Sequence, residues 1–356
     1  MNIATPTKDI TGGVAFEPDP AEPLRFLRAC PAYEPTPVRE IGIAGGAKIA
    51  IKDETNRMGL GAFKALGGVY AVARLIMDRC EAVMGRMPRP DEMLGPEVGE
   101  VAGLMTFVCA SAGNHGMAVA EGARIFGASA RIYLAETVPQ GFEMRLKARE
   151  AEVVRHGKTY EESVEAAISD ARETGAILLA DGSWPGYVGP PSLVMEGYTV
   201  LAEELRQDFE RKGQWPTHVY LQAGVGGLAG AIAHMIRNNW SVQPVICVVE
   251  PDRAACLAAS HKAGRPAHVT GAESNMGRLD CKEPSIVAFA ALENACVEYM
   301  EVSDEEAAGA ARALEGHGIT TTPSGAAGYA AILASGLLQA SASSYRPLAI
   351  VTEGAV

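Results

Sequence analysis

The lysine at position 64 stands in the segment Gly59-Leu60-Gly61-Ala62-Phe63-Lys64-Ala65-Leu66-Gly67-Gly68, where every neighbour is small or apolar. A lysine taken out of water loses part of its preference for the charged form, so its amine becomes available as a nucleophile for a Schiff base and later as a base. An arbitrary lysine more often lies at the protein surface. Two glycine-bearing loops elsewhere in the chain favour a chemical role for Lys64, which is suited to holding an aldehyde.

The first of these loops is Ser111-Ala112-Gly113-Asn114-His115-Gly116, between a β-rich run at 106–110 and an apolar helical stretch. Such a strand-to-helix turn exposes backbone N–H groups at the positive end of a helix, which suits a carboxylate or a phosphate. Asn114 adds an amide for a ligand, although an N-cap role explains it equally well. His115 is more typical of a packed or capping group than of an acid or base.

The second loop, Gln222-Ala223-Gly224-Val225-Gly226-Gly227-Leu228, also joins a predicted strand to a predicted helix. Its glycines allow the backbone to close on a phosphate at a helix start. The spacing does not match the dinucleotide fingerprint, and the Gly-Lys-Ser/Thr of a nucleotide-binding P-loop is missing. A tight turn for helix–sheet packing explains one such loop, but not its occurrence together with Lys64 and the first loop.

Short β-rich runs alternate along the chain with longer helical stretches, which predicts an α/β fold with two lobes and mostly parallel, twisted sheets flanked by helices. We predict strands at 47–51, 104–110, 130–134, 151–155, 218–221, 245–249 and 348–351. We predict helices at 62–79, 115–126, 140–150, 160–173, 193–211, 227–238, 304–315 and 325–334.

Two breaks rich in proline and glycine divide this pattern. The segment 81–100 holds three prolines and mixed charge, and 181–191 holds three glycines and three prolines, so both are typical of surface crossings between lobes. They enclose a smaller lobe from about 104 to 179. We therefore predict a large cofactor-binding domain from 1–85 and 190–356, and a small domain at 86–189 that carries the Ser111 loop.

Composition limits the partners and the compartment. The 356 residues are 48% apolar and carry a formal net charge of −12, which argues against nucleic acid or an anionic membrane as a main partner. Seven scattered cysteines without CxxC or metal-finger spacing suggest free thiols in a reducing compartment. Since no leader-like or membrane-spanning run is evident, we expect a cytoplasmic protein. No His, Asp or Glu cluster has metal-ligand spacing, so we expect no catalytic metal.

From about 52 to 354, the chain resembles the pyridoxal-phosphate enzymes of the tryptophan synthase β-subunit fold type, known as fold type II. Within them it is most similar to the diaminopropionate ammonia-lyases. The resemblance rests on the Lys64 segment, on Lys52-Asp53-Glu54, on both glycine loops, on Trp184-x-Gly186-Tyr187 and on Thr352-Glu353-Gly354. It also includes Val249-Glu250-Pro251-Asp252, Cys281-x-Glu283-Pro284 and Ser324-Gly325-Ala326. It implies pyridoxal 5'-phosphate as the cofactor, an amino acid as the substrate and a homodimer as the assembly.

The resemblance also implies roles for individual residues. Lys64 would form the Schiff base with the cofactor and act as the base, and Asp181 would select the leaving group. The cofactor phosphate would lie on Gly224, Val225, Gly226 and Gly227, with Asn114 at the phenolic oxygen and Thr352 at the ring nitrogen. The substrate carboxylate would lie on Ser111, Ala112, Gly113 and Asn114. From the residues alone, Asp181-Gly182 is an ordinary turn pair and Thr352 an ordinary strand residue.

Two positions depart from the diaminopropionate ammonia-lyase pattern. That family carries Thr-Asp before Gly-Asn-His-Gly, whereas this chain has Ser111-Ala112, so the acid that deprotonates D-substrates is absent. Pro323 also replaces a glutamate. We expect β-elimination from an L-amino acid that releases ammonia and a 2-keto acid, with L-2,3-diaminopropionate or a β-N-substituted analogue as substrate. The alternatives are a serine/threonine-type dehydratase, which Ser111-Ala112 resembles, and an amino-acid-binding protein without turnover.

Overall fold

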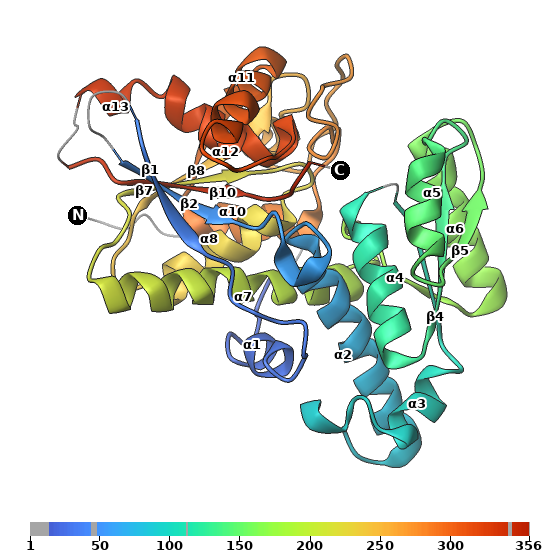
Figure 1. The fold of residues 1–356 in the computed structure, drawn as a ribbon. Coiled ribbons are helices and arrows are strands. Elements are labelled where there is room, and N and C mark those ends of the chain that lie inside the picture. Colours follow the sequence, from blue (N-terminus) through green and yellow to red (C-terminus); the bar gives the residue numbers. More distant parts are fainter. Residues whose placement is uncertain (1–13, 44–47, 112, 341–343, 356) are drawn as a thin grey trace.

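The computed structural model describes residues 14–43, 48–111, 113–340 and 344–355. Its strands form two separate sheets covered by helices, which confirms the predicted α/β class with two lobes and mostly parallel sheets (Figure 1). Among the helices in the described ranges, none is both long and apolar enough to cross a bilayer.

The larger sheet has the strand order β1-β2-β10-β7-β8-β9. Only the edge strand β1 runs antiparallel to its neighbour, and the other described pairs are parallel. Every residue of the inner strand β10 is buried, as expected for a parallel strand covered on both faces. The strands are β1 (Val38–Gly42), β2 (Lys48–Asp53), β7 (His218–Gln222), β8 (Val245–Pro251), β9 (Glu298–Val302) and β10 (Pro347–Val351).

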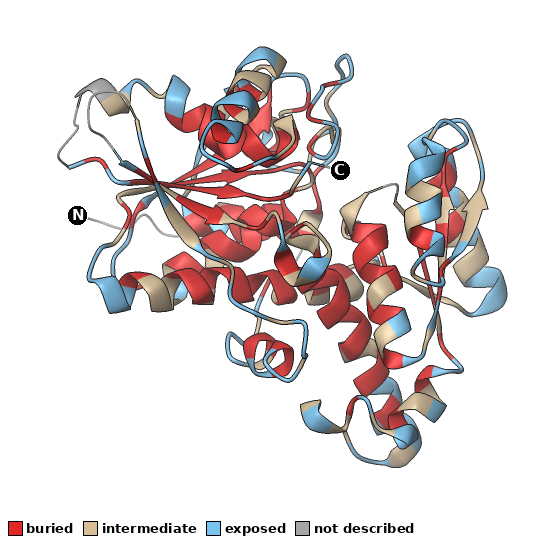
Figure 2. Ribbon diagram, viewed as in Figure 1, coloured by how far each residue is buried: buried red, intermediate tan, exposed pale blue. Residues whose placement is uncertain are grey.

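Helices cover both faces of this sheet. On one side lie α7 (Gly189–Lys212), α8 (Gly227–Asn239) and α10 (Ile286–Ala295), and on the other α11 (Asp304–Glu315) and α12 (Pro323–Ala334) (Figure 1). Figure 2 shows the buried strands between these two helical layers. The shorter helices are α1 (Glu22–Leu27), which contacts α7, α9 (Cys256–Ala263), which contacts α10, and α13 (Leu337–Ala340).

The smaller sheet has the order β5-β4-β3-β6, and its described pairs are all parallel. Its strands are β3 (Thr106–Ala110), β4 (Ser129–Leu134), β5 (Glu152–Arg155) and β6 (Ile177–Leu178). The accompanying helices are α3 (Pro96–Ala102), α4 (Asn114–Phe126), α5 (Gln140–Lys147) and α6 (Tyr160–Thr174). This sheet falls inside the small domain predicted at 86–189, a division of the chain that we retain as a proposal.

Helix α2 (Lys64–Met84) begins in the larger lobe and runs alongside α4 of the smaller one (Figure 1). Glycines allow its backbone to approach both neighbours closely. A Cβ atom on Gly68 would lie 2.5 Å from the Ala118 Cβ on α4, and one on Gly67 would lie 2.4 Å from the Tyr198 ring on α7. These contacts leave no room for larger side chains, so α2 is packed tightly against both lobes.

The predicted elements agree well with the observed ones. Each predicted strand is present, although residue 47 lies outside the described ranges, and each predicted helix is present with shifts at its ends. Helix α7 begins at Gly189, so Pro190 and Pro191 belong to its first turn rather than to the preceding loop. Among the strands and α-helices, the sequence analysis missed β1, β6, β9, α1, α3, α9, α10 and α13.

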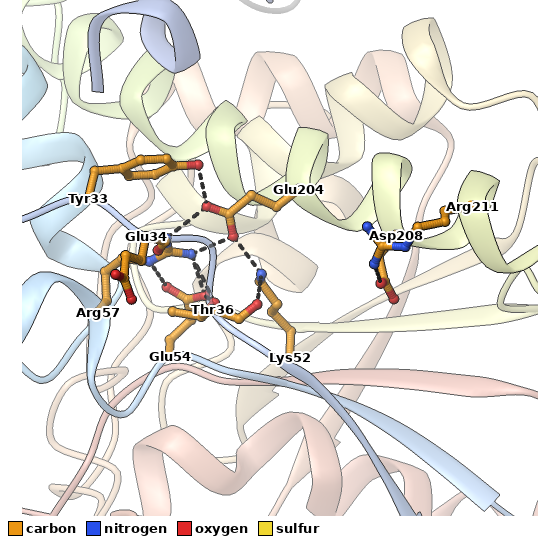
Figure 3. A network of polar contacts seen from close by, with 9 residues as sticks. All are labelled: Tyr33, Glu34, Thr36, Lys52, Glu54, Arg57, Glu204, Asp208 and Arg211. Atoms are coloured by element: carbon orange, nitrogen blue, oxygen red, sulfur yellow. Dashed lines mark hydrogen bonds and ion pairs between the residues drawn. The ribbon is translucent and has the colours of Figure 1, made fainter. Parts of the chain in front are cut away.

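A buried ion network, which we call the Arg57 network, fixes the segment leading to Lys64 (Figure 3). Arg57 lies in the short 3-10 helix η1 (Arg57–Gly59) and is fully buried. Its guanidinium donates to Glu54 at 2.6 and 2.7 Å, and to Glu204 of α7 at 2.7 and 2.8 Å. Lys52 donates to the same Glu204 at 2.5 Å. Because Glu54 also bonds Val351 of β10 through its N–H, the network joins α7, the Lys64 segment and the central sheet.

Candidate active site

Lys64 and Asp181 face each other where the two lobes meet. Lys64 is the first residue of α2, and Asp181 lies in the loop that follows β6. Lys64 Nζ is 2.5 Å from Asp181 Oδ2, and the two side chains are 21% and 25% exposed. The structure thus brings together the two predicted catalytic residues, which are separated by 117 positions in the sequence.

Burial and the neighbouring charges move the pKa of Lys64 and that of Asp181 in opposite directions. Burial acts to lower the pKa of the Lys64 ammonium, but Asp181 and the phenol of Tyr198 outweigh it and raise the pKa above its ordinary value. Burial acts to raise the pKa of Asp181, and Lys64 and His115 more than reverse that effect. The contact with Asp181 therefore acts against the loss of charge that we expected from burial, and the sequence neighbours of Lys64 do not reveal this carboxylate at 2.5 Å.

Tyr198 of α7 forms one wall of the site, which the sequence analysis did not foresee. Lys64 Nζ lies 5.7 Å from the centroid of the Tyr198 ring and 5.3 Å from that of Phe63, so both rings face the ammonium. Burial and Asp181 raise the pKa of Tyr198 to about 12. Its buried hydroxyl has no hydrogen-bond partner among the described residues.

The second glycine loop has the form of a phosphate cradle. A Cβ on Gly224 would lie 2.9 Å from the Cys281 Sγ and 3.2 Å from the Arg278 carbonyl oxygen, and Gly226 has a φ of +98°. Helix α8 begins at Gly227, so the loop presents the N–H groups of a helix start. A Cβ on Gly182, next to Asp181, would lie 3.9 Å from Val225, which places the loop beside the Lys64–Asp181 pair.

Thr352 follows β10 and is 5% exposed. Its carbonyl accepts the N–H of Phe63 at 3.0 Å, so it lies next to the Lys64 segment. The Thr352 hydroxyl accepts from Gln222 Nε2 at 3.3 Å, which leaves its own proton available to an acceptor such as an aromatic nitrogen.

The Ser111 loop closes on itself at the end of β3. The Ser111 hydroxyl accepts the Gly113 N–H at 3.2 Å, and the Met117 N–H bonds the Gly113 carbonyl at 3.3 Å. Helix α4 begins at Asn114 and its N-cap is Gly113, so Asn114 is not the N-cap that we considered. Ala112, a predicted substrate contact, lies outside the described residues.

Glu353 is a site residue that the sequence analysis named only as part of a motif. Its buried carboxylate accepts a hydrogen bond from Asn114 Nδ2 and another from the Thr322 hydroxyl at 2.5 Å. Arg278 Nε lies 3.3 Å from the same carboxylate. Glu353 therefore orients Asn114, and only its position directly after Thr352 could have indicated this from the sequence.

His115 has the packed role that we favoured. It is 4% exposed, and its Nε2 lies 2.8 Å from the Leu179 carbonyl oxygen. Burial lowers its pKa, and the contact with a carbonyl oxygen makes Nε2 the donor.

These groups fit pyridoxal phosphate. The phosphate suits the glycine loop and the aldehyde suits Lys64, while the Asn114 amide and the Thr352 hydroxyl are polar groups that could bond the phenolic oxygen and the ring nitrogen. Each of these protein groups is a donor or nucleophile of the type that the cofactor requires. Within the described ranges, no group of three or more His, Cys, Asp or Glu side chains is placed to hold a metal ion.

Comparison with known proteins agrees with this fit. The family model for pyridoxal-phosphate dependent enzymes matches residues 29–353. Diaminopropionate ammonia-lyase of Escherichia coli K12 is 33% identical over 296 residues, which cover 82% of this chain and 73% of that protein. L-Threonine ammonia-lyase of Thermotoga maritima is 28% identical over 229 residues, which cover 64% of this chain and 54% of that protein.

The fold is also shared with solved structures. The E. coli diaminopropionate ammonia-lyase, solved in complex with an aminoacrylate-PLP azomethine reaction intermediate, superposes with a TM-score of 0.78. It is 30% identical to this chain, and the match covers 95% of this chain and 89% of that one. The chain therefore belongs to the pyridoxal-phosphate dependent enzymes, as a fold type II lyase that uses pyridoxal 5'-phosphate.

Proposed function

We propose that the protein is an ammonia-lyase that eliminates the β-substituent of an L-amino acid and releases ammonia and a 2-keto acid. Its substrate is L-2,3-diaminopropionate or a β-N-substituted analogue. The observation that carries this proposal is the ion pair between Lys64 and Asp181, with 2.5 Å between Nζ and Oδ2. A carboxylate beside the lysine supports the proposal, because it would attract a cationic β-amine.

The bound cofactor supplies an electron sink that stabilises negative charge at Cα of the substrate. Lys64, from the start of α2, is the base that takes the Cα proton on its Nζ. For this it must be neutral, whereas Asp181 favours the ammonium form. A β-ammonium on the substrate would compete with Lys64 for Asp181, weaken the pairing and lower the pKa of Lys64. A β-hydroxyl carries no charge and would not do so.

Asp181 then has a second task at the leaving group. A proton accepted by Lys64 Nζ has Asp181 Oδ2 as its next acceptor at 2.5 Å. From Asp181 the proton can pass to a β-nitrogen that is bound as the neutral amine, which then leaves as an amine, whereas a β-ammonium leaves as the neutral amine without a further proton. In this way one carboxylate both binds the β-amine and assists its departure.

The substrate carboxylate is bound by the Ser111 loop in this proposal. The start of α4 provides N–H donors and a favourable dipole, and the Ser111 hydroxyl can exchange its bond to Gly113 for one to the substrate. Ala112 belongs to the same loop and carries no acid. Lys64 is then the base on one face of Cα, and we expect turnover of L-substrates only.

A serine/threonine-type dehydratase is the second candidate. The Ser111-Ala112 pair favours it, and the similarity to the T. maritima L-threonine ammonia-lyase supports it. In that case the leaving group would be a hydroxyl, and Asp181 would serve only to protonate it.

A substrate panel separates these candidates. Purified protein loaded with pyridoxal phosphate is given L- and D-2,3-diaminopropionate, L-serine and L-threonine, and keto acid and ammonia are measured. Turnover of L-2,3-diaminopropionate that exceeds that of L-serine is expected. Rapid turnover of serine or threonine with none of diaminopropionate would contradict the proposal.

The variant Asp181→Asn gives a second, selective test. Because the amide cannot attract an ammonium, we expect a larger loss of kcat/KM on diaminopropionate than on β-chloroalanine, whose leaving group needs no proton. An equal loss on both substrates would instead indicate that Asp181 only maintains the structure of its loop.

We further propose a cytoplasmic, homodimeric protein. The seven cysteines have free thiols, which supports a reducing compartment. Light scattering coupled to size exclusion tests the dimer, and fractionation of cells tests the location.

A further inference from the structure

Two arginines from different lobes meet on one aromatic ring beside the Ser111 loop. Phe142 and Arg145 lie on α5 of the smaller lobe, and Arg278 lies in the segment between α9 and α10 of the larger one. The guanidinium carbon of Arg278 is 5.5 Å from the centroid of the Phe142 ring, and that of Arg145 is 5.9 Å from it. We call these two residues the arginine pair.

Arg278 is built into the site rather than extended into solvent. Its backbone N–H bonds the Ser324 hydroxyl at 3.2 Å, and its Nε is 3.3 Å from the Glu353 carboxylate that orients Asn114. Its Cδ, Nε and Cζ lie 3.5, 3.6 and 3.8 Å from the position that a Cβ on Gly113 would occupy. The side chain is thus laid along the loop assigned to the substrate carboxylate, and it is 32% exposed.

Around the arginine pair, positive charge exceeds negative charge. Arg145 is half-buried, and no carboxylate of the described residues lies within ion-pair distance of it. Burial lowers its pKa, and so do the neighbouring guanidinium groups of Arg149 and Arg278, while Glu353 alone acts in the opposite direction. Glu353 already accepts bonds from Asn114 and Thr322. Arg278 therefore shares Glu353 with two other donors, and among the described residues Arg145 has no carboxylate paired with it.

Building on the proposed function, we infer that the arginine pair selects substrates whose β-substituent carries a carboxylate. The α-carboxylate occupies the Ser111 loop, and the second carboxylate is held between Arg278 and Arg145. Planar guanidinium groups suit this task because they bind a carboxylate through two parallel hydrogen bonds. The substrate class is thus a β-N-(carboxyalkyl) derivative of L-2,3-diaminopropionate.

The reaction balances for the simplest member, β-N-(carboxymethyl)-L-2,3-diaminopropionate. Lys64 takes the Cα proton, the Cβ–N bond breaks with its electron pair going to nitrogen, and that nitrogen takes a proton and leaves as glycine. Hydrolysis of the remaining three-carbon unit by one water gives pyruvate and ammonia. No oxidant or reductant is needed.

The experiment compares two substrates that differ only in charge, the β-N-(carboxymethyl) compound and its β-N-(carbamoylmethyl) amide. With the cofactor-loaded enzyme, we expect kcat/KM to be at least about tenfold higher for the carboxylate, the size of one charge-assisted hydrogen bond. Arg278→Met and Arg145→Met should each reduce this preference. Arg278→Lys should retain part of it, and Arg124→Met, on the outer side of α4, should retain all of it.

Binding gives a readout that does not depend on turnover. L-2-Aminoadipate has a methylene in place of the β-nitrogen and cannot eliminate, and L-homoglutamine is its neutral amide. Calorimetric titration should show tighter binding of the aminoadipate, and Arg278→Met should remove the difference.

The outcomes separate this inference from the proposed function. If diaminopropionate is turned over but the carboxylate and its amide react and bind alike, the inference is wrong and the proposed function stands. If Arg278→Met weakens every substrate equally, Arg278 holds the α-carboxylate instead, which also overturns the inference. If the tighter binding of aminoadipate over homoglutamine depends on Arg278 but no β-amine is released from any substrate, the proposed elimination is wrong and the inferred carboxylate-binding role of Arg278 stands.

Discussion

Removal of Arg57, which is not one of the candidate site residues, should destabilise the protein strongly. The substitution Arg57→Met removes four hydrogen bonds to two carboxylates, those of Glu54 and Glu204, at 2.6 to 2.8 Å. These side chains are 0% and 4% exposed, so water cannot replace the lost donors. Breaking a buried ion pair by removing one partner costs about 3–5 kcal/mol. Lys52 still neutralises Glu204, so we expect about 4 kcal/mol.

The assay is urea denaturation of the cofactor-loaded protein, followed by circular dichroism at a fixed excess of pyridoxal phosphate, because bound ligand shifts the midpoint. The matched control is Arg89→Met, which removes the ion pairs of a side chain that is 69% exposed, with Asp91 and Glu92, and should leave the midpoint unchanged. The double variant Glu54→Gln/Arg57→Met removes the stranded charge and should recover about 2 kcal/mol. The reasoning is refuted if Arg57→Met behaves like Arg89→Met, or if the double variant is less stable than the single one.

Three further predictions concern the site and its surroundings. Lys64→Ala should abolish covalent attachment of the cofactor. Borohydride reduction followed by mass spectrometry should find a cofactor adduct at position 64 in the wild-type protein and no adduct in the variant; an adduct in the variant would contradict the assignment. Gly224→Ala should weaken cofactor binding at least about tenfold, since its Cβ would lie 2.9 Å from Cys281 Sγ, whereas Gly99→Ala, with nothing within 4 Å, should not change the cofactor titration. Burial raises the pKa of Glu250 from 4.5 to about 7, so between these pH values the folded state binds a proton that the unfolded state has released. The free energy of unfolding should therefore fall as the pH rises from about 4.5 to 7. Measured across this range, it should decline less in Glu250→Gln, and equal slopes in the two proteins would show that Glu250 is not responsible.

The buried strands could be predicted because their physical signal is local. β8 and β10 are runs of branched apolar residues bounded by turns, and both are almost entirely buried. The missed strand β1 is an antiparallel edge strand with one buried residue, Ile41. Helix α10 was missed because seven of its ten residues are buried, so no polar face marks the helical period.

The individual site residues could be predicted from the sequence, but their positions relative to one another could not. Each glycine loop follows a strand in the sequence, and its position at a helix start follows from that order. The 2.5 Å contact between Lys64 and Asp181 depends on how two lobes meet, and it reverses the direction in which the Lys64 pKa moves. Tyr198 lies on a helix and Arg278 on a loop, and both are distant from Lys64 in the sequence. The residues around each of them form no motif that would indicate a position in the site.

The close glycine contacts of α2 have a consequence for engineering this enzyme. Gly67, Gly68, Gly122 and Gly197 each lie where an added Cβ would press on another helix at 3.2 Å or less, so a library that varies them would mostly yield misfolded protein. The residues inferred to read the substrate side chain stand outside this contact, on α5 and on a loop of the larger lobe. Selection for new β-substituents can therefore proceed at those positions while the lysine proposed to carry the chemistry keeps its place.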